Sequence, residues 1–166
     1  MGSPSIAGSY AEDIAVIQKT ESSWSMAGTT YAICVKNAED GKVKDFCAKR
    51  AVKAFESAIS INPESIEHRI NLAICYVDQP SSDNPMQGIL MLRELNTQYP
   101  ENVPVLNQLG KLALQTNQTE KALERLEAAI KLEPENKNTI CLLATAYKNA
   151  GNEAKALLFA NQYIDL

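Results

Sequence analysis

The sequence predicts an all-α protein built as a solenoid of antiparallel helix hairpins. The first observation is a 34-residue repeat in the C-terminal half, where Gly110 and Ala144 lie 34 positions apart, as do Ala122 and Ala156. The second is that a small residue on the first helix of each copy precedes an alanine on the second by 12 positions. Two helices per 34 residues are typical of helical repeats, which bury their apolar faces only against neighbouring repeats.

The same pattern continues upstream and gives the order of the elements. We expect residues 1–10 to be a disordered tail or an expression scar, and residues 11–20 to form an N-terminal helix. One repeat domain then covers residues 21–166, with hairpins at about 21–65, 66–102, 103–136 and 137–166. Proline ends the second helix of each of the first three hairpins, because the residue before proline resists helical geometry; these prolines are Pro63, Pro100 and Pro134.

Two hairpins depart from the 12-residue spacing. In the second, Ala73 and Gly88 are 15 positions apart, and the three-residue excess falls in DQPSSDNP, whose composition predicts a loop. In the first, Gly28 and Ala51 are 23 positions apart. This excess predicts a hairpin longer by about three helical turns, shared between its two arms, with its turn near residues 37–41.

Small residues recur at one position of every first helix. Glycine inside a helix costs roughly 1 kcal/mol relative to alanine, so Gly28 needs a reason. The equivalent positions are all small: Gly28, Ala73, Gly110 and Ala144. We expect the two helices of each hairpin to cross closely there, because small residues let helix axes approach.

These motifs resemble a known family. The first hairpin reads WxxAGxxY over Trp24–Tyr31 and AxxxFxxA over Ala51–Ala58. With the closing Pro63 and the 34-residue period, the pattern resembles the tetratricopeptide repeat over roughly residues 21–166. The resemblance implies a right-handed superhelix of hairpins, with first helices that line a concave groove for a peptide or a partner helix.

The family's groove positions identify the candidate binding residues of this chain. They are Ser25, Thr29, Glu67, Ile70, Ile74, Val77, Asp78, Asn107, Lys111, Leu114, Asn138, Thr145 and Lys148. The middle of this groove is apolar, which suits an extended or helical segment with aliphatic anchors. An alternative stays open, in which residues 11–20 fold back over Ile70, Ile74 and Val77, or the curvature of the array covers them.

One family function is disfavoured. Chaperone-binding members hold a C-terminal carboxylate with a clamp of lysines, asparagines and an arginine. Asn71 fits one clamp position here, but the other positions hold Ser25, Thr29, Pro104 and Gln108. The resemblance therefore implies a protein-interaction scaffold or adaptor other than a chaperone cochaperone.

The alternative function is a structural unit that binds through its terminal helix face while the groove stays idle. The last helix has no later helix to cover its apolar side chains. A homodimer through this helix would use Leu158, Tyr163 and Ile164. Exposed apolar patches of this kind are common at protein interfaces.

The sequence offers no catalytic constellation. His68 is the single histidine, which we expect to be a partly exposed helix residue, and there is no glycine-rich phosphate loop or GxSxG motif. We therefore predict no enzyme, no cofactor and no metal site. A net charge of −4 argues against nucleic-acid binding, and no apolar run of about 18 residues predicts membrane insertion.

The four cysteines form no zinc-binding pattern. Cys34 and Cys47 lie nearly symmetrically about the predicted turn of the long hairpin, so they can come within disulfide reach and pair in an oxidising compartment. The alternative is four free thiols in a reducing cytosol. The cytoplasm is favoured, and a periplasmic or membrane-anchored protein stays open if a segment precedes the sequence.

Overall fold

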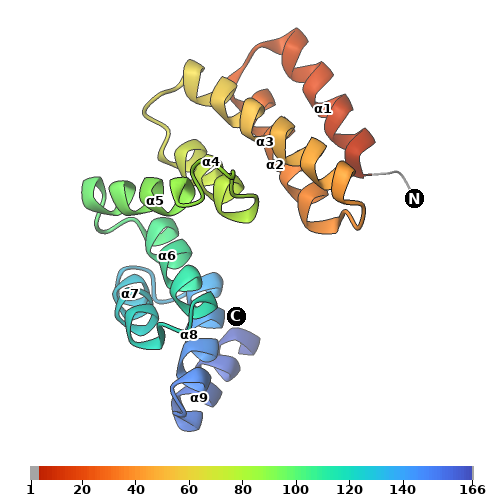
Figure 1. Ribbon diagram of the computed structural model, residues 1–166. Helices are drawn as coiled ribbons and strands as arrows, with labels where there is room; N and C mark the ends of the chain where they lie inside the picture. The colour runs from red at the N-terminus through yellow and green to blue at the C-terminus, as the bar shows by residue number, and fades with distance from the viewer. Residues whose placement is uncertain (1–3, 166) are drawn as a thin grey trace. The chain divides into compact units, whose positions relative to one another are not determined.

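The computed structural model of the chain describes residues 4–165, which form nine α-helices and no strand (Figure 1). The helices are α1 (Pro4–Gln18), α2 (Glu21–Asn37), α3 (Gly41–Ile61), α4 (Ile66–Asp78), α5 (Gln87–Gln98), α6 (Val103–Gln115), α7 (Thr119–Leu132), α8 (Lys137–Asn149) and α9 (Glu153–Asp165). None of these helices is long and apolar enough to cross a membrane.

The chain forms two compact units, Met1–Met91 and Leu92–Leu166, each of which is described by itself. The single domain over 21–166 therefore stays a prediction.

The connections between successive hairpins follow one pattern. Each second helix ends two residues before a proline, α3 at Ile61, α5 at Gln98 and α7 at Leu132. The next helix is capped by Ser65, Asn102 or Asn136, two residues after that proline. Each capping side chain accepts a hydrogen bond from the backbone N–H three residues further on. Proline thus stops one helix and a polar cap starts the next at a fixed distance.

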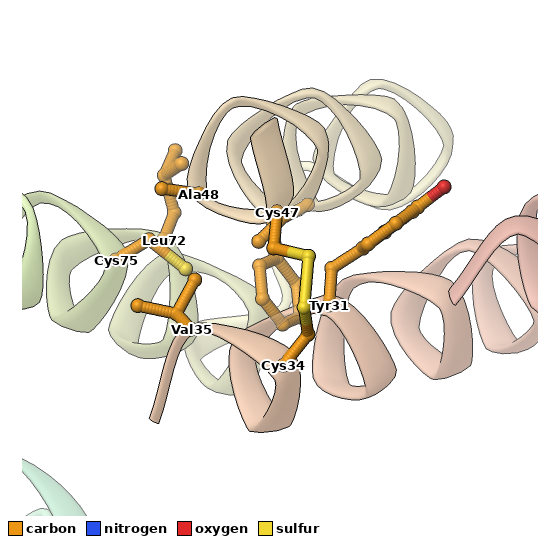
Figure 2. Packing of buried hydrophobic residues seen from close by; sticks show 9 residues of the cluster. Tyr31, Cys34, Val35, Cys47, Ala48, Leu72 and Cys75 are labelled. Carbon is orange, nitrogen blue, oxygen red and sulfur yellow. A yellow bond between two sulfur atoms is a disulfide. The ribbon is translucent and has the colours of Figure 1, made fainter. Parts of the chain in front are cut away.

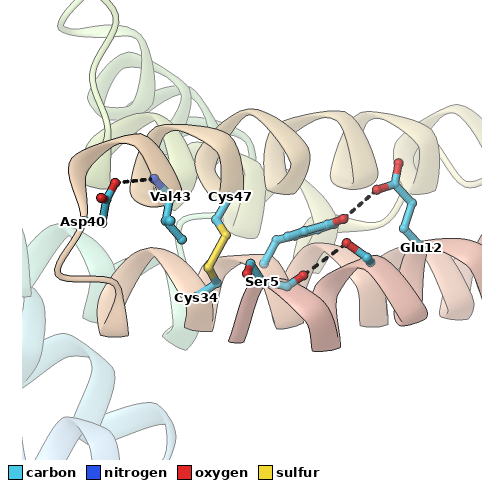
Figure 3. Close-up of a disulfide and its surroundings, with 8 residues drawn as sticks. Ser5, Glu12, Cys34, Asp40, Val43 and Cys47 are labelled. Atoms are coloured by element: carbon cyan, nitrogen blue, oxygen red, sulfur yellow. Dashed lines mark hydrogen bonds between the residues drawn. A yellow bond between two sulfur atoms is a disulfide. The ribbon is translucent and has the colours of Figure 1, made fainter. Parts of the chain in front are cut away.

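The first hairpin is the longest. Its helices α2 and α3 have 17 and 21 residues, against 13 and 14 in α6 and α7. The chain turns over residues 38–40, and Asp40 starts α3 by accepting hydrogen bonds from the backbone N–H groups of Lys42 at 2.7 Å and Val43 at 3.1 Å (Figure 3). The added length is thus divided between both arms.

The helices of a hairpin approach closely at the small residues, as the sequence predicts. A Cβ atom added to Gly28 would lie 2.8 Å from Cζ of the Phe55 ring in α3. One added to Gly110 would lie 2.7 Å from Cγ of Leu126 in α7. The space left by each glycine is therefore filled by a large side chain of the partner helix, and this packing offsets the lost helix propensity.

Helix α1 begins earlier than the sequence predicts. It starts at Pro4 instead of residue 11, so residues 4–10 are helical and not a disordered tail, while residues 1–3 lie outside the described range. The physical reason is a row of small side chains, since Gly8, Ala11 and Ala15 are buried on one face of α1. Small residues let α1 pack closely on α2 and α3.

Glu12 ties α1 to both helices of the first hairpin. Its Oε2 accepts a hydrogen bond from the Tyr31 hydroxyl at 2.7 Å (Figure 3). Its Oε1 pairs with Nη1 of Arg50 at 2.8 Å. Burial and the bond to Glu12 both raise the pKa of Tyr31. Helix α1 therefore lies against α2 and α3 and not across α4, which argues against its covering the predicted groove residues of α4.

A disulfide joins α2 and α3 near the tip of the long hairpin. The Cys34 and Cys47 Cα atoms are 6.0 Å apart and both side chains are fully buried (Figures 2 and 3). The bridge belongs to a core that includes Tyr31, Phe55 and the free cysteine Cys75 of α4. Burial, together with the nearby Asp78, raises the pKa of the Cys75 thiol to about 12.

Counting reactive thiols tests this arrangement. Without reductant, the folded protein should show one fast-reacting thiol, that of the exposed Cys141, since Cys75 is buried and protonated at neutral pH. The chain unfolded in denaturant should show two thiols without reductant and four after reduction. Four thiols in the unfolded, unreduced chain would contradict the disulfide.

The second unit has its own core between α6, α7, α8 and α9. Its buried residues are Ala113, Ala122, Leu126, Leu143, Ala146 and Tyr147. The Tyr147 ring stacks on Phe159 of α9 with ring centroids 5.7 Å apart, and its hydroxyl donates to Glu127 of α7. These contacts bind α9 to α8 and α8 to the preceding hairpin.

Candidate partner-binding surface

In each unit, the predicted groove residues lie on two neighbouring helices. The first helices of successive hairpins are neighbours, α2 beside α4 in the first unit and α6 beside α8 in the second. Asp78 of α4 lines the same small pocket as Ala32 and Val35 of α2. The predicted binding residues therefore lie on one pair of neighbouring helices in each unit.

The open face of α2 carries large apolar side chains. Thr29 is exposed and Ser25 is half-buried, as expected for residues that line a surface. Met26 and Ile33, on either side of Thr29, have exposed fractions of 57% and 51%. Positions i, i+3 and i+7 share one face of a helix, so Met26, Thr29 and Ile33 form a continuous strip.

The open face of α4 is mixed. Glu67 and Asp78 are exposed, and Ile74 is half-buried between them together with Asn71. The spacing of these four residues, i, i+4, i+7 and i+11, places them on one face of the helix. The apolar part of the surface thus consists of Met26, Ile33 and Ile74, with two carboxylates beside it.

Two predicted residues of α4 turn away from this face. Ile70 is buried, so its predicted place in an open groove is wrong. Val77 is half-buried and faces α5, since a Cβ atom added to Gly88 would lie 2.7 Å from its Cγ2 atom. Both residues lie at the edge of the predicted face, where a small helix rotation decides between core and surface.

In the second unit the predicted surface is polar. Lys111, Asn138, Thr145 and Lys148 are exposed. Leu114 is half-buried against the core of this unit. Lys111 and Lys148 lie on this surface, and Glu153 of α9 lines the same pocket as Lys148, so its charge is mixed, in contrast to the apolar and acidic surface of α2 and α4.

Asn107 is a further correction. It is buried, and its Oδ1 accepts a hydrogen bond from the Thr139 hydroxyl of α8 at 3.0 Å. A buried amide oxygen with such a partner is a structural contact between α6 and α8. Asn107 therefore holds the two helices together and does not line an open groove.

His68 is also buried and not partly exposed as expected. Its Nε2 atom lies 3.0 Å from Oε1 of Glu21, which joins the start of α4 to the start of α2. The contact fixes the two first helices of the unit at their N-terminal ends. His68 thus positions the candidate surface without lying on it.

Met26 is the surface residue that the sequence analysis missed. The signal was its spacing, since it lies four positions after Ser22 and three before Thr29. Met26 is not one of the family's groove positions, and it stands beside the buried Ala27 and Gly28.

The described residues hold no obvious inorganic site. Within residues 4–165, no group of three or more His, Cys, Asp and Glu side chains could hold a metal ion. Their chemistry is that of a surface for a polypeptide, with apolar anchoring positions and charges beside them.

Comparisons with known proteins agree with this architecture. Residues 103–136 match the tetratricopeptide-repeat family. A crystal structure of MamA superposes with a TM-score of 0.60 at 14% identity, covering 96% of this chain and 85% of that one. MamA from AMB-1 gives 0.57 at 18% identity, covering 97% and 99%. YrrB, described as a TPR protein with an unusual peptide-binding site, gives 0.57 at 16% identity, covering 95% and 81%. No curated protein matches the sequence.

The repeat and the fold together define the class. Residues 103–136 match the tetratricopeptide-repeat family, and the chain as a whole has the all-α solenoid fold of solved structures such as MamA and YrrB. The resemblance drawn from WxxAGxxY and the 34-residue period is thereby confirmed. Proteins of this class are interaction scaffolds, and this one has the same architecture.

Proposed function

We propose that the chain is a non-catalytic adaptor that binds a peptide or a partner helix on the first helices of its hairpins. The observation that carries the proposal is the exposure of Met26 and Ile33 beside the half-buried Ile74. Large apolar side chains grouped on neighbouring helices are typical of docking surfaces. The description of YrrB, a solved structure of the same fold, names a peptide-binding site, which supports the proposal.

The charges indicate the chemistry of the ligand. Glu67 and Asp78 lie on the same face of α4 as Ile74, and no basic side chain of the predicted set lies there. A segment with aliphatic or aromatic anchors and at least one lysine or arginine complements this surface. Opposite charges across an interface favour the encounter and the register more than the affinity itself.

A matched pair of methionine substitutions tests the proposal. Met26→Lys places a charge in the middle of the apolar strip, whereas Met86→Lys makes the same change at a similarly exposed residue, 48% against 57%, in the loop before α5. Lysine is a good helix former, so both variants should fold, which circular dichroism would check. A partner captured from the source lysate should be retained by wild type and Met86→Lys, with binding to Met26→Lys weakened at least tenfold. Equal retention by all three proteins would contradict the proposal.

A further inference from the structure

The outer face of α1 is an apolar strip. Ile6, Tyr10, Ile14 and Ile17 are all exposed, with Ile17 at 81%. Their spacing of i, i+4, i+8 and i+11 places them on one face of the helix. The opposite face carries Gly8, Ala11 and Ala15, which pack on the first hairpin. The strip is therefore largely exposed, although Ile6 also lines a pocket with Val43 and Phe46 of α3.

The last hairpin has a trough of matching character. It measures about 570 Å³ and lies between α8 and α9. Its lining residues are Ala144, Thr145, Lys148, Asn149, Glu153, Ala156, Leu157 and Ala160. Leu157 is 63% exposed, and Ile164 two turns later is also exposed. Small residues form the floor and large apolar residues the wall, which suits a packed helix.

The preceding hairpin shows what occupies such a trough. Ala122, Leu123 and Leu126 of α7 stand 34 positions before Ala156, Leu157 and Ala160. In that hairpin these residues pack in one cluster with Leu143, Ala146 and Tyr147 of α8. The equivalent positions of α8 and α9 therefore form a seat for one further amphipathic helix.

We infer that the occupant is α1 of a second copy of this chain, so that copies associate head to tail. Leu143 and Tyr147 of α8, which pack against α7, are four positions apart, and Tyr10 and Ile14 of α1 have the same spacing. Asp13 flanks the strip of α1, and Lys148 and Glu153 both line the trough, so the favoured placement sets Asp13 beside Lys148 and away from Glu153. This pair of opposite charges sets the orientation in which α1 lies.

This contact joins two different surfaces, so each copy keeps one free strip and one free trough. Such heterologous contacts extend into open chains unless the rotation closes a ring. The contact rests on one helix of 15 residues, only about 22 Å long, which is short for a standard interface of roughly 800 Å² per partner. Association is therefore weak and rises with protein concentration.

Two complementary variants test the inference. Ile17→Lys blocks the strip and Leu157→Lys blocks the trough, both at exposed positions whose replacement should leave the fold intact. In analytical ultracentrifugation over a concentration series, wild type and Met86→Lys should grow beyond dimers. Each blocked variant alone should stay monomeric. The two mixed in equal amounts should form dimers and nothing larger, because only one strip and one trough remain intact.

Charge exchange adds a second readout. Asp13→Lys and Lys148→Asp should each weaken association at low salt, and their mixture should restore it. The inference is overturned if wild type stays monomeric at millimolar concentration. It is also overturned if Ile17→Lys associates like wild type, which would place self-association on α9 alone, through residues such as Leu158 and Tyr163.

Discussion

Gly88→Ala should be the most damaging single-methyl change in the chain, lowering the free energy of unfolding by about 2–4 kcal/mol. A Cβ atom at Gly88 would lie 2.4 Å from the Ala73 carbonyl oxygen and 2.7 Å from the Val77 backbone nitrogen. Both obstacles are backbone atoms of α4, which cannot rotate away as a side chain can. Helix α5 must therefore move off α4, and the packing of the second hairpin is lost.

Gly41→Ala is the matched control for this prediction. A Cβ atom at Gly41 meets nothing within 4 Å, so the change should be neutral or slightly stabilising. Urea unfolding followed by circular dichroism measures both variants. Equal midpoints for Gly88→Ala and wild type would contradict the close approach of α4 and α5.

Removing the disulfide should have the second large effect. Cys34→Ala/Cys47→Ala should lower the stability of the first unit by about 3 kcal/mol, the loop-closure value for a bridge over a short loop. The bridge spans 13 positions and both side chains are fully buried. Its loss frees the tip of the long hairpin and leaves a gap beside Tyr31 and Phe55.

Reductant supplies the control within one experiment. Wild type should lose stability in dithiothreitol, whereas the double alanine variant should unfold at the same urea concentration with and without it. Cys75→Ala should keep the wild-type response to reductant, since Cys75 is not in the bridge. A wild-type midpoint that does not respond to reductant would contradict a stabilising disulfide.

The architecture follows from features that recur in the sequence. Small residues recur at a fixed position of every hairpin, and a proline follows the second helix of each of the first three hairpins. Each of these residues acts through its local effect on the backbone. Proline stops a helix wherever it stands, and Ser65, Asn102 and Asn136 cap the next one. The period of 34 residues also predicts that each hairpin packs on its neighbour.

The surface residues are harder to predict, because exposure depends on the rotation of each helix. Ile70 and Asn107 occupy equivalent places in successive units, 37 positions apart, and both are turned inward. Met26 is exposed although it is not one of the family's groove positions, while its neighbours Ala27 and Gly28 are buried. The period identifies which helix faces the groove. It does not fix the rotation of that helix about its axis, and a rotation by part of a turn moves a side chain from the surface into the core.

The early start of α1 shows another limit. Residues 4–10 read as a tail because Gly8 and Ser9 are poor helix formers. The tertiary contact reverses that preference, since small residues let α1 pack closely on the first hairpin, and Glu12 adds bonds to Tyr31 and Arg50. Contacts of this range, 19 and 38 positions apart, leave no local signal in the sequence.

The central claim is that the first helices of the hairpins receive the partner. Site-specific photo-crosslinking tests it most directly, because a photoreactive residue at an exposed position reports contact without disturbing the core. We predict adducts with the captured partner from Thr29 of α2, and none from Lys53 of α3, an exposed residue of the second helix in the same hairpin. Adducts from Lys53 and none from Thr29 would contradict the account and move the partner to the opposite side of the hairpin.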